Sequence, residues 1–302
     1  MQNRMGITRR ELLVASMGMA AACSLPAAAT GRRFVSTDSV VCNTMPEQTV
    51  GPYYIANELL RSDIREGRPG LPLSLRLLVL DSRTCRPLAD AAVDVWHCDA
   101  LGQYAGFTKM SMGGPGQGAP GPPPPGPPPG FDPRHSGNRG GLPEGMGPPP
   151  AMKPSDEHTF LRGIQFTDAK GRVAFATVLP GFYMGRTNHI HFKVREGGRV
   201  VGRGAGDGKT YVEGHTSHIG QVFFPEGQMA SLMKLEPYVS HQVHRTTLAE
   251  DDIFQDQHGR ESTARLELLD SQHPEAGYVA ELIVAVNPSI TPPQTGMGGP
   301  PR

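Results

Sequence analysis

The sequence predicts an all-β fold, a β-sandwich of mixed short strands with long loops and few helices. Two features favour this class: short runs rich in Val, Ile, Phe and Tyr recur along the chain, and polar turn residues separate them. The chain lacks the regular alternation of strand and helix patterns that is typical of parallel α/β folds. With 302 residues, of which 37% are hydrophobic and 19% charged, it can bury one or two ordinary cores.

The expected strands are short and follow one another closely, except where a Pro/Gly-rich insertion separates them. They cover residues 73–81, 91–99, 160–168, 171–179, 188–196, 220–227 and 278–288. The stretch from Phe160 to Val178 is expected to form a hairpin, because a turn sequence, Asp168 to Gly171, joins its two strand patterns. The best candidate for a helix is MASLMKLEPYVSH, residues 229–241.

The first 29 residues are expected to be an export signal. They combine a basic start, the pair Arg9–Arg10 and a weakly apolar run that ends in Ala27–Ala29, a pattern of the twin-arginine type. The less favoured alternative is a lipoprotein signal, in which Cys23 accepts a lipid anchor. No later segment is long and apolar enough for a stable membrane span, so we expect an exported protein, periplasmic or extracellular.

The folded domain is expected to cover residues 30–290. Residues 113–150 consist largely of Pro and Gly, which cannot supply a strand ladder or a core, so they predict a low-complexity insertion. Residues 291–302 have the composition of a disordered tail. The formal net charge is zero and no basic stripe occurs, so no nucleic-acid partner is expected.

Three cysteines remain after removal of the signal: Cys42, Cys85 and Cys98. An oxidising compartment favours one disulfide and one remaining thiol, and the spacing fits no zinc motif. Which two cysteines pair stays open at this point.

The stretch RTNHIHFKV, residues 186–194, carries the first functional signal. Its period-two alternation is typical of a strand, so His189 and His191 project side by side from one face. Such a pair alone is more often two polar side chains on a solvent face. Tyr183 precedes the pair after a Pro-Gly turn, and Tyr104 ends another strand pattern. Phenolate is a hard anion, so two phenolates with two imidazoles favour Fe(III) over Zn(II) or Cu(II).

Four stretches together carry a family resemblance: PEQTVGPYY (46–54), VDVWHCDALGQYAGF (93–107), PGFYMGRTNHIHFKV (180–194) and GQVFFPEG (220–227). In this order they resemble the intradiol ring-cleavage dioxygenases, the group that includes catechol 1,2- and protocatechuate 3,4-dioxygenases. The resemblance covers roughly residues 40 to 290, and the sequence around the histidines, GRTNHIH, is more similar to the secreted branch of the family. The insertion departs from the family pattern, since it follows Tyr104, where family members have a shorter loop.

The resemblance implies one non-haem Fe(III) per chain, with four protein ligands. These are Tyr104, Tyr183, His189 and His191, of which Tyr104 stays on the metal and Tyr183 is displaced by substrate. Arg186 matches the arginine beside the substrate ring, and Gln221 a glutamine of the substrate site. The implied reaction takes a small aromatic diol of the catechol type and O₂, and opens the ring between its two hydroxyls to a cis,cis-muconate.

Two other readings of the sequence stay open. One is a secreted β-sandwich binding module with a degenerate metal site and no activity, and the other a copper or zinc protein that uses only the histidines. Further histidine pairs, His215 with His218 in an expected loop and His241 with His244, are assigned surface or core roles, and His97 a packed one. The identity of the catechol and the oligomeric state, for which a homodimer is one expectation, are left open.

Overall fold

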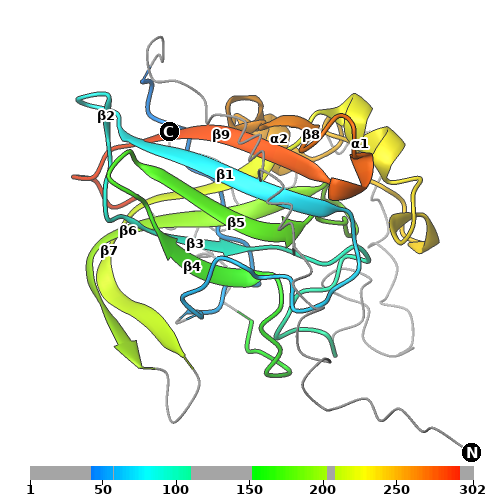
Figure 1. Ribbon diagram of the computed structural model, residues 1–302, viewed down its shortest axis with the longest axis horizontal. Coiled ribbons are helices and arrows are strands. Elements are labelled where there is room, and N and C mark those ends of the chain that lie inside the picture. The colour runs from blue at the N-terminus through cyan, green and yellow to red at the C-terminus, as the bar shows by residue number, and fades with distance from the viewer. Residues whose placement is uncertain (1–41, 57, 110–151, 203–207, 293–302) are drawn as a thin grey trace, which may run out of the picture. The chain divides into compact units, whose positions relative to one another are not determined.

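The computed structural model describes residues 42–56, 58–109, 152–202 and 208–292 (Figure 1). The predicted export signal with Cys23, the insertion at 113–150 and all but the first two residues of the predicted tail at 291–302 lie outside the described residues. Within the described part of the chain, no helix is long and apolar enough to cross a membrane.

One sheet joins the start and the end of the described domain. It runs in the order β2–β1–β9–β8, and β5 also pairs with β1. Its strands are β1 (Pro72–Asp81), β2 (Arg86–Pro87), β5 (Arg172–Val178), β8 (Arg265–Leu268) and β9 (Tyr278–Val286). β1 and β9 pair in parallel and the other pairs are antiparallel, so the sheet is mixed.

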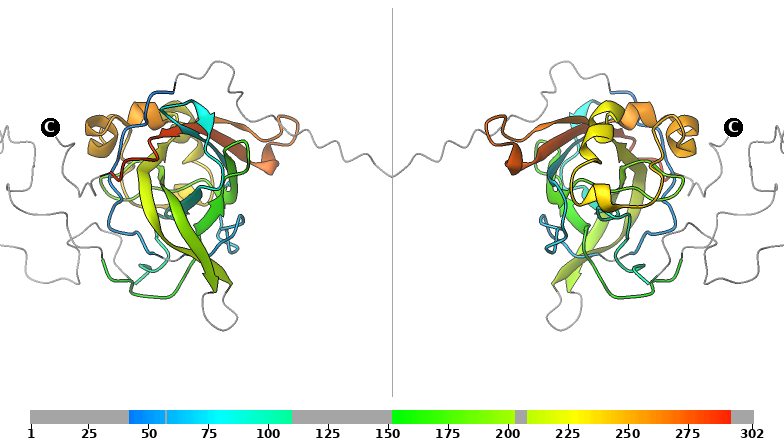
Figure 2. Two further views of the ribbon diagram at one scale, coloured as in Figure 1. Left: turned by 90° about the vertical axis from the view of Figure 1, so that its left-hand side faces the viewer. Right: turned by 90° about the vertical axis from the view of Figure 1, so that its right-hand side faces the viewer.

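The second sheet is antiparallel throughout, in the order β4–β3–β6–β7. Its strands are β3 (Ala92–Trp96), β4 (Arg162–Phe166), β6 (His189–Gly202) and β7 (Lys209–Phe223). β3 pairs with β6 only as far as Arg195. Beyond that point β6 and β7 pair with each other alone and extend past the sheets as a two-stranded ribbon (Figures 1 and 2).

The main core lies between the two sheets, which confirms the predicted β-sandwich. Alternate residues of each strand point inward, such as Leu75 and Leu77 of β1 and Val93 and Val95 of β3. Each fully buried side chain of this kind stabilises the fold by about 1.5–3 kcal/mol. Trp96 of β3 belongs to a separate aromatic cluster, so the outer face of the four-stranded sheet is covered as well.

The predicted hairpin over 160–178 is wrong. β4 pairs with β3 in one sheet, whereas β5 pairs with β1 in the other. The turn between them is formed as expected, with the Asp168 carboxylate accepting from the backbone N–H of Lys170 and Arg172. It carries the chain across the sandwich, and a period-two pattern cannot tell such a crossing from a hairpin, because both strands have one apolar face.

The predicted helix at 229–241 is also displaced. α1 spans Glu226–Leu232, and a separate 3₁₀ turn, η1, spans Tyr238–Ser240. The break precedes Pro237, which has no N–H to donate. After the break Tyr238 turns inward, where its hydroxyl donates to the carbonyl of Leu179 and accepts from the N–H of Leu71.

Several short elements have no counterpart among the predictions. They are β2, β8, α2 (Asp252–Asp256), η2 (Gly259–Ser262), η3 (Pro274–Ala276) and the first half of β7. The helical segments α1, η1 and α2 lie toward the same end of the sandwich (Figures 1 and 2).

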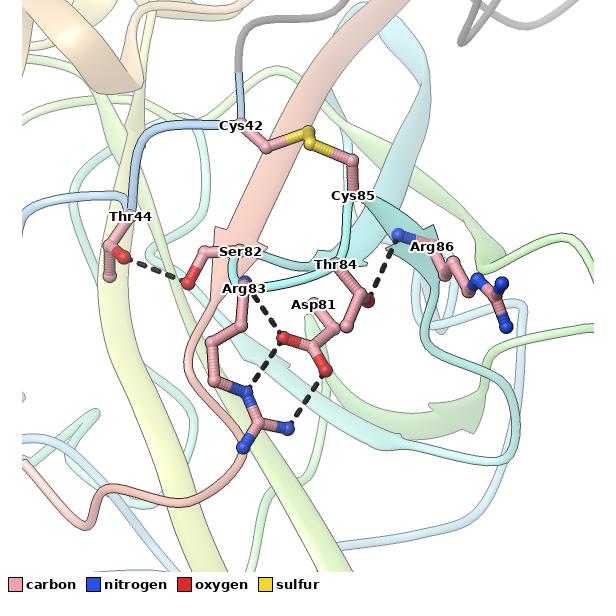
Figure 3. The surroundings of a disulfide bond; sticks show 8 residues. All are labelled: Cys42, Thr44, Asp81, Ser82, Arg83, Thr84, Cys85 and Arg86. Carbon is pink, nitrogen blue, oxygen red and sulfur yellow. Dashed lines mark hydrogen bonds and ion pairs between the residues drawn. A yellow bond between two sulfur atoms is a disulfide. The ribbon is translucent and has the colours of Figure 1, made fainter.

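A disulfide joins Cys42 and Cys85, which settles the pairing that the sequence left open (Figure 3). It ties the segment before the first strand to the β1–β2 turn, where Thr44 also donates a hydrogen bond to Ser82. Among the described cysteines Cys98 is the free thiol, and it is buried.

Candidate metal centre

The candidate site lies on the outer face of the four-stranded sheet, along one row of paired residues. This row contains, in order across the sheet, Arg162 of β4, Trp96 of β3, His191 of β6 and Gln221 of β7. All four side chains are buried. His189 shares the face, because residues i and i+2 of a strand point the same way.

The imidazole rings of the two histidines meet on the same side of the sheet. Nδ1 of His189 lies 2.6 Å from the carbonyl oxygen of Thr187, and since a carbonyl only accepts, this nitrogen carries the proton and Nε2 is left free. The Nε2 atoms of His189 and His191 are 3.1 Å apart. Burial, and secondarily neighbouring cationic groups, lower the pKa of both imidazoles well below the usual range, so both are neutral at pH 7.

The His191 ring is held from two sides. The indole of Trp96 stacks on it with centroids 5.0 Å apart and an interplanar angle of 4°. The backbone of Gly51 approaches it from the segment before β1: a Cβ on this residue would lie 3.0 Å from Cε1 of His191, and its φ of +70° favours glycine. The orientation of this imidazole is therefore fixed by packing.

Tyr183 reaches the histidines from a tight turn. The N–H of Arg186 donates to the carbonyl of Tyr183 at 3.0 Å, and Gly185 supplies the positive φ that the turn requires. The Tyr183 hydroxyl lies 3.5 Å from Nε2 of His189. The sequence-predicted return of this ring over the strand is therefore found in the structure.

Tyr104 approaches from the loop that follows β3, and it is 2% exposed. Its hydroxyl is buried and makes no hydrogen bond of ordinary geometry to the described residues. The loop is fixed by Asp156, whose carboxylate accepts from the N–H groups of Gly106 and Thr108 at 2.9 and 2.7 Å. Residues 106–108 and 156 therefore lie together, on either side of the insertion in the sequence.

The four predicted ligand side chains converge. Ring centroids are 4.7 Å apart for His189–His191, 5.7 Å for Tyr183–His189, 5.8 Å for Tyr104–Tyr183 and 6.4 Å for Tyr104–His191. Burial raises the pKa of both phenols above the usual range although Arg186 lies nearby, so without a metal ion both stay protonated. Two neutral imidazoles and two phenols, of which Tyr104 has no hydrogen bond of ordinary geometry within the described residues, fit a hard trivalent cation that would ionise the phenols.

Arg186 lies beside this group in a network of buried polar side chains. Its Nε donates to the Asp251 carboxylate at 3.0 Å, and its Nη2 donates to the amide oxygen of Gln221. Gln221 is oriented in turn, since its amide nitrogen donates to the carbonyl of Thr49 at 3.0 Å. The structure therefore brings together all six residues that the resemblance singles out.

Asp251 is the main residue of the site that no sequence pattern indicated. It is fully buried, and its carboxylate accepts from the backbone N–H groups of Thr187 and Phe254 as well as from Arg186. It lies 65 residues after Arg186 at the N-cap of α2, a short helix that was not predicted. Tyr53 was within reach of the sequence, because it belongs to the PEQTVGPYY stretch, and its ring stacks on Tyr104 with centroids 4.4 Å apart.

Three histidines outside the site make hydrogen bonds elsewhere in the sandwich. His215 and His218 lie on β7 and not in a loop, a correction to the prediction, and His218 is buried with Nδ1 2.6 Å from a Glu47 carboxylate oxygen. His97 is packed as predicted, between the carbonyl of Cys98 and the hydroxyl of Thr177, both at 2.7 Å.

Solved structures similar to this chain include an intradiol ring-cleavage dioxygenase from Tetranychus urticae. It is 28% identical with a TM-score of 0.62, over 83% of this chain and 98% of that chain. A second dioxygenase structure is 28% identical with a TM-score of 0.62, over 84% of this chain and 98% of that one. The dioxygenase domain of a carbohydrate-binding fusion protein from Streptomyces sp. SirexAA-E is 19% identical with a TM-score of 0.44, over 80% and 97%.

No family model and no curated protein sequence matches the chain. The first two structural likenesses span nearly all of the related chains, and they confirm the resemblance to the intradiol ring-cleavage dioxygenases that the four sequence stretches predicted.

Proposed function

We propose that this chain, which resembles the intradiol ring-cleavage dioxygenases in sequence and fold, is a non-haem Fe(III) dioxygenase. It opens the ring of a catechol-type diol between the two hydroxyls, consumes O₂ and gives a cis,cis-muconate. The observation that carries the proposal is the closed set of two imidazoles and two phenols, with neighbouring ring centroids 4.7 to 6.4 Å apart.

The proposed iron ligands are Tyr104, Tyr183, His189 and His191, with one iron per chain. When bound, Fe(III) supplies a Lewis-acidic and redox-active centre for the two oxygens of the diol. The donor set supports this metal, because phenolate oxygen prefers a hard trivalent ion and Nε2 of His189 carries a lone pair, 3.1 Å from Nε2 of His191.

The two tyrosines are assigned different duties. Tyr104 is the more deeply buried and remains a permanent anionic ligand. Tyr183 lies on a turn with exposed neighbours, Met184 and Gly185, so it can move without disturbing a strand. We assign its phenol oxygen the role of the base that receives a proton from the bound diol.

Arg186 is assigned the substrate-facing charge. Its side chain is 12% exposed, and the bonds to Asp251 and Gln221 fix the guanidinium beside the two phenols, so it stabilises negative charge that develops on the ring. Trp96 keeps the His191 ring in place, and the aromatic cluster around Tyr53 and Phe107 limits the access of water.

We further propose that the protein is exported in folded form by the twin-arginine route, with a lipid anchor at Cys23 as the lesser alternative. This rests on the sequence of the first 29 residues, and the Cys42–Cys85 disulfide is typical of an oxidising compartment.

Metal analysis with a substrate panel tests the proposal. Protein expressed aerobically and purified without added metal should contain about one iron per chain and show the reddish colour of tyrosinate–Fe(III) charge transfer. Oxygen uptake should follow addition of catechol, protocatechuate or hydroxyquinol, for at least one of them. Stoichiometric zinc or copper would favour the histidine-only reading, and a colourless, metal-free protein would favour the binding module.

A further inference from the structure

Arg162 is a buried cation on the outer face of the four-stranded sheet, and the proposed chemistry does not use it. It lies on β4 in register with Trp96, the residue that stacks on His191. Its side chain is 1% exposed, and its guanidinium stays charged because arginine is not deprotonated in proteins. The Glu58 carboxylate is the nearest anion, with Oε1 at 3.8 Å from Nε.

The guanidinium donates to two backbone carbonyls, one at each tyrosine of a stacked pair. Nη2 donates to the carbonyl oxygen of Tyr53 at 2.8 Å, and Nε and Nη2 donate to that of Ala105 at 3.1 and 2.7 Å. Ala105 directly follows Tyr104, and the rings of Tyr53 and Tyr104 stack with centroids 4.4 Å apart. One side chain therefore fixes the backbone at both members of the stacked pair.

The charge also lies close to the proposed ligand itself. The central carbon of the guanidinium is 5.9 Å from the centroid of the Tyr104 ring. Nη1 is buried and makes no hydrogen bond to the described residues, so this end of the guanidinium is not paired with an acceptor among them. A cation in a buried setting acts on a nearby anion more strongly than it would in water.

We propose that Arg162 is a positioning residue for the metal centre: it fixes the Tyr104 ring through the backbone carbonyls of Tyr53 and Ala105. The inference rests on the proposed function, because it concerns the binding of iron by Tyr104. The role requires the planar guanidinium, which binds two carbonyls at once, as well as the positive charge. Lysine therefore cannot replace arginine at this position.

Arg61 provides a matched control. It too is an arginine that donates to backbone carbonyls of this region, from Nε and Nη2 to Arg162 and from Nη2 to Thr159, at 2.6 to 3.0 Å. Within the described part of the chain its hydrogen bonds go to Arg162, Thr159 and Glu66, and not to Tyr53 or Ala105. If these arginines only stabilise the fold through backbone carbonyls, substitutions at Arg162 and at Arg61 should have equal effects.

The experiment compares Arg162→Lys, Arg162→Gln and Arg61→Lys, each in the wild-type chain and in a Tyr104→Phe background. Three quantities are measured: iron affinity by competition with a chelator, the position of the visible charge-transfer band, and the melting temperature of the metal-free protein. The wild-type chain in the same series tests the proposed function separately, since it must bind iron and show the band.

We expect Arg162→Lys and Arg162→Gln to weaken iron binding by roughly 10- to 100-fold, as is usual when a group that orients a ligand is removed. The band should shift, whereas Arg61→Lys should change affinity by less than about twofold. With Phe at position 104, the Arg162 substitutions should have almost no further effect on affinity, because residues that act through one another are not additive.

Two results would overturn the inference while leaving the proposed function intact. The first is an iron affinity and band in Arg162→Lys like those of the wild type, or an equal loss in the Tyr104→Phe background. The second is that neither Arg162 variant folds without metal although Arg61→Lys does, which would make Arg162 a structural residue only. A wild-type chain that binds no iron would instead refute the proposed function.

Discussion

Asp251→Asn should loosen Arg186, the guanidinium assigned to the proposed substrate site. The Asp251 carboxylate is fully buried and accepts from Nε of Arg186 at 3.0 Å and from the N–H groups of Thr187 and Phe254 at 2.8 and 3.0 Å. Asparagine keeps one side-chain acceptor but removes the negative charge. Arg186 would then be held less firmly, with Gln221 as its remaining strong side-chain partner.

The size of the effect follows from the burial of the pair. Breaking a buried ion pair by removing one partner costs about 3–5 kcal/mol. Arg186 keeps the Gln221 bond and 12% exposure, so we expect a lower value, about 2–3 kcal/mol, in the free energy of unfolding. If the same interaction is needed to stabilise charge on the ring, kcat/KM falls by roughly 30- to 150-fold.

Asp252→Asn is the matched control, because it makes the same chemical change at the exposed neighbouring residue in the first turn of α2. Urea denaturation measures the stability, and oxygen uptake with the best catechol measures kcat/KM. The control should change stability by less than about 0.5 kcal/mol. Equal effects of the two substitutions, or wild-type kinetics in Asp251→Asn, would refute the assigned role of the Arg186–Asp251 pair.

Three further predictions concern the tyrosines, acid stability and the insertion. Tyr104→Phe should weaken iron retention and the visible band, whereas Tyr183→Phe should keep iron and bind catechol but lose ~10²–10⁴-fold in turnover; wild-type turnover in Tyr183→Phe would contradict its role as the base. Burial lowers the pKa of His97 to about 4. As pH falls from about 6.5 towards 4, the unfolded chain therefore takes up a proton that the folded chain does not, and about 3 kcal/mol of stability is lost. In urea melts across this range His97→Gln should show a correspondingly flatter pH dependence, and an unchanged slope would count against a neutral buried imidazole. Replacing residues 113–150 with a short Gly-Ser linker should leave the iron spectrum and melting temperature nearly unchanged, because Asp156 holds residues 106 and 108 near the far end of the segment; loss of iron would show that the insertion supports the site.

The candidate site was easiest to predict where its residues lie within a clear strand pattern. The alternation at His189 and His191 required a shared face, and the structure has both on the outer face of β6. The two tyrosines could be added only through the combination of stretches, because a tyrosine at the end of a strand is unremarkable by itself. The strands themselves were found because buried strands carry a clear apolar pattern.

The parts that could not be predicted depend on contacts between distant segments. Nothing local at Asp251 indicates that it meets Arg186, and the partner of each strand is chosen by packing across the sandwich, which is why β4 and β5 were wrongly paired. Arg162 reads as one polar residue at the start of a strand, and its contacts with Tyr53 and Ala105 exist only once three segments are folded together.

The most direct test of the central claim is the fate of labelled oxygen. The purified protein is given ¹⁸O₂ and the best catechol of the panel, and the product is analysed by mass spectrometry while oxygen uptake is recorded. The account predicts one O₂ consumed per diol and a cis,cis-muconate that carries label from both atoms of O₂. A ring opened beside the two hydroxyls instead of between them, or uptake without ring opening, would contradict it.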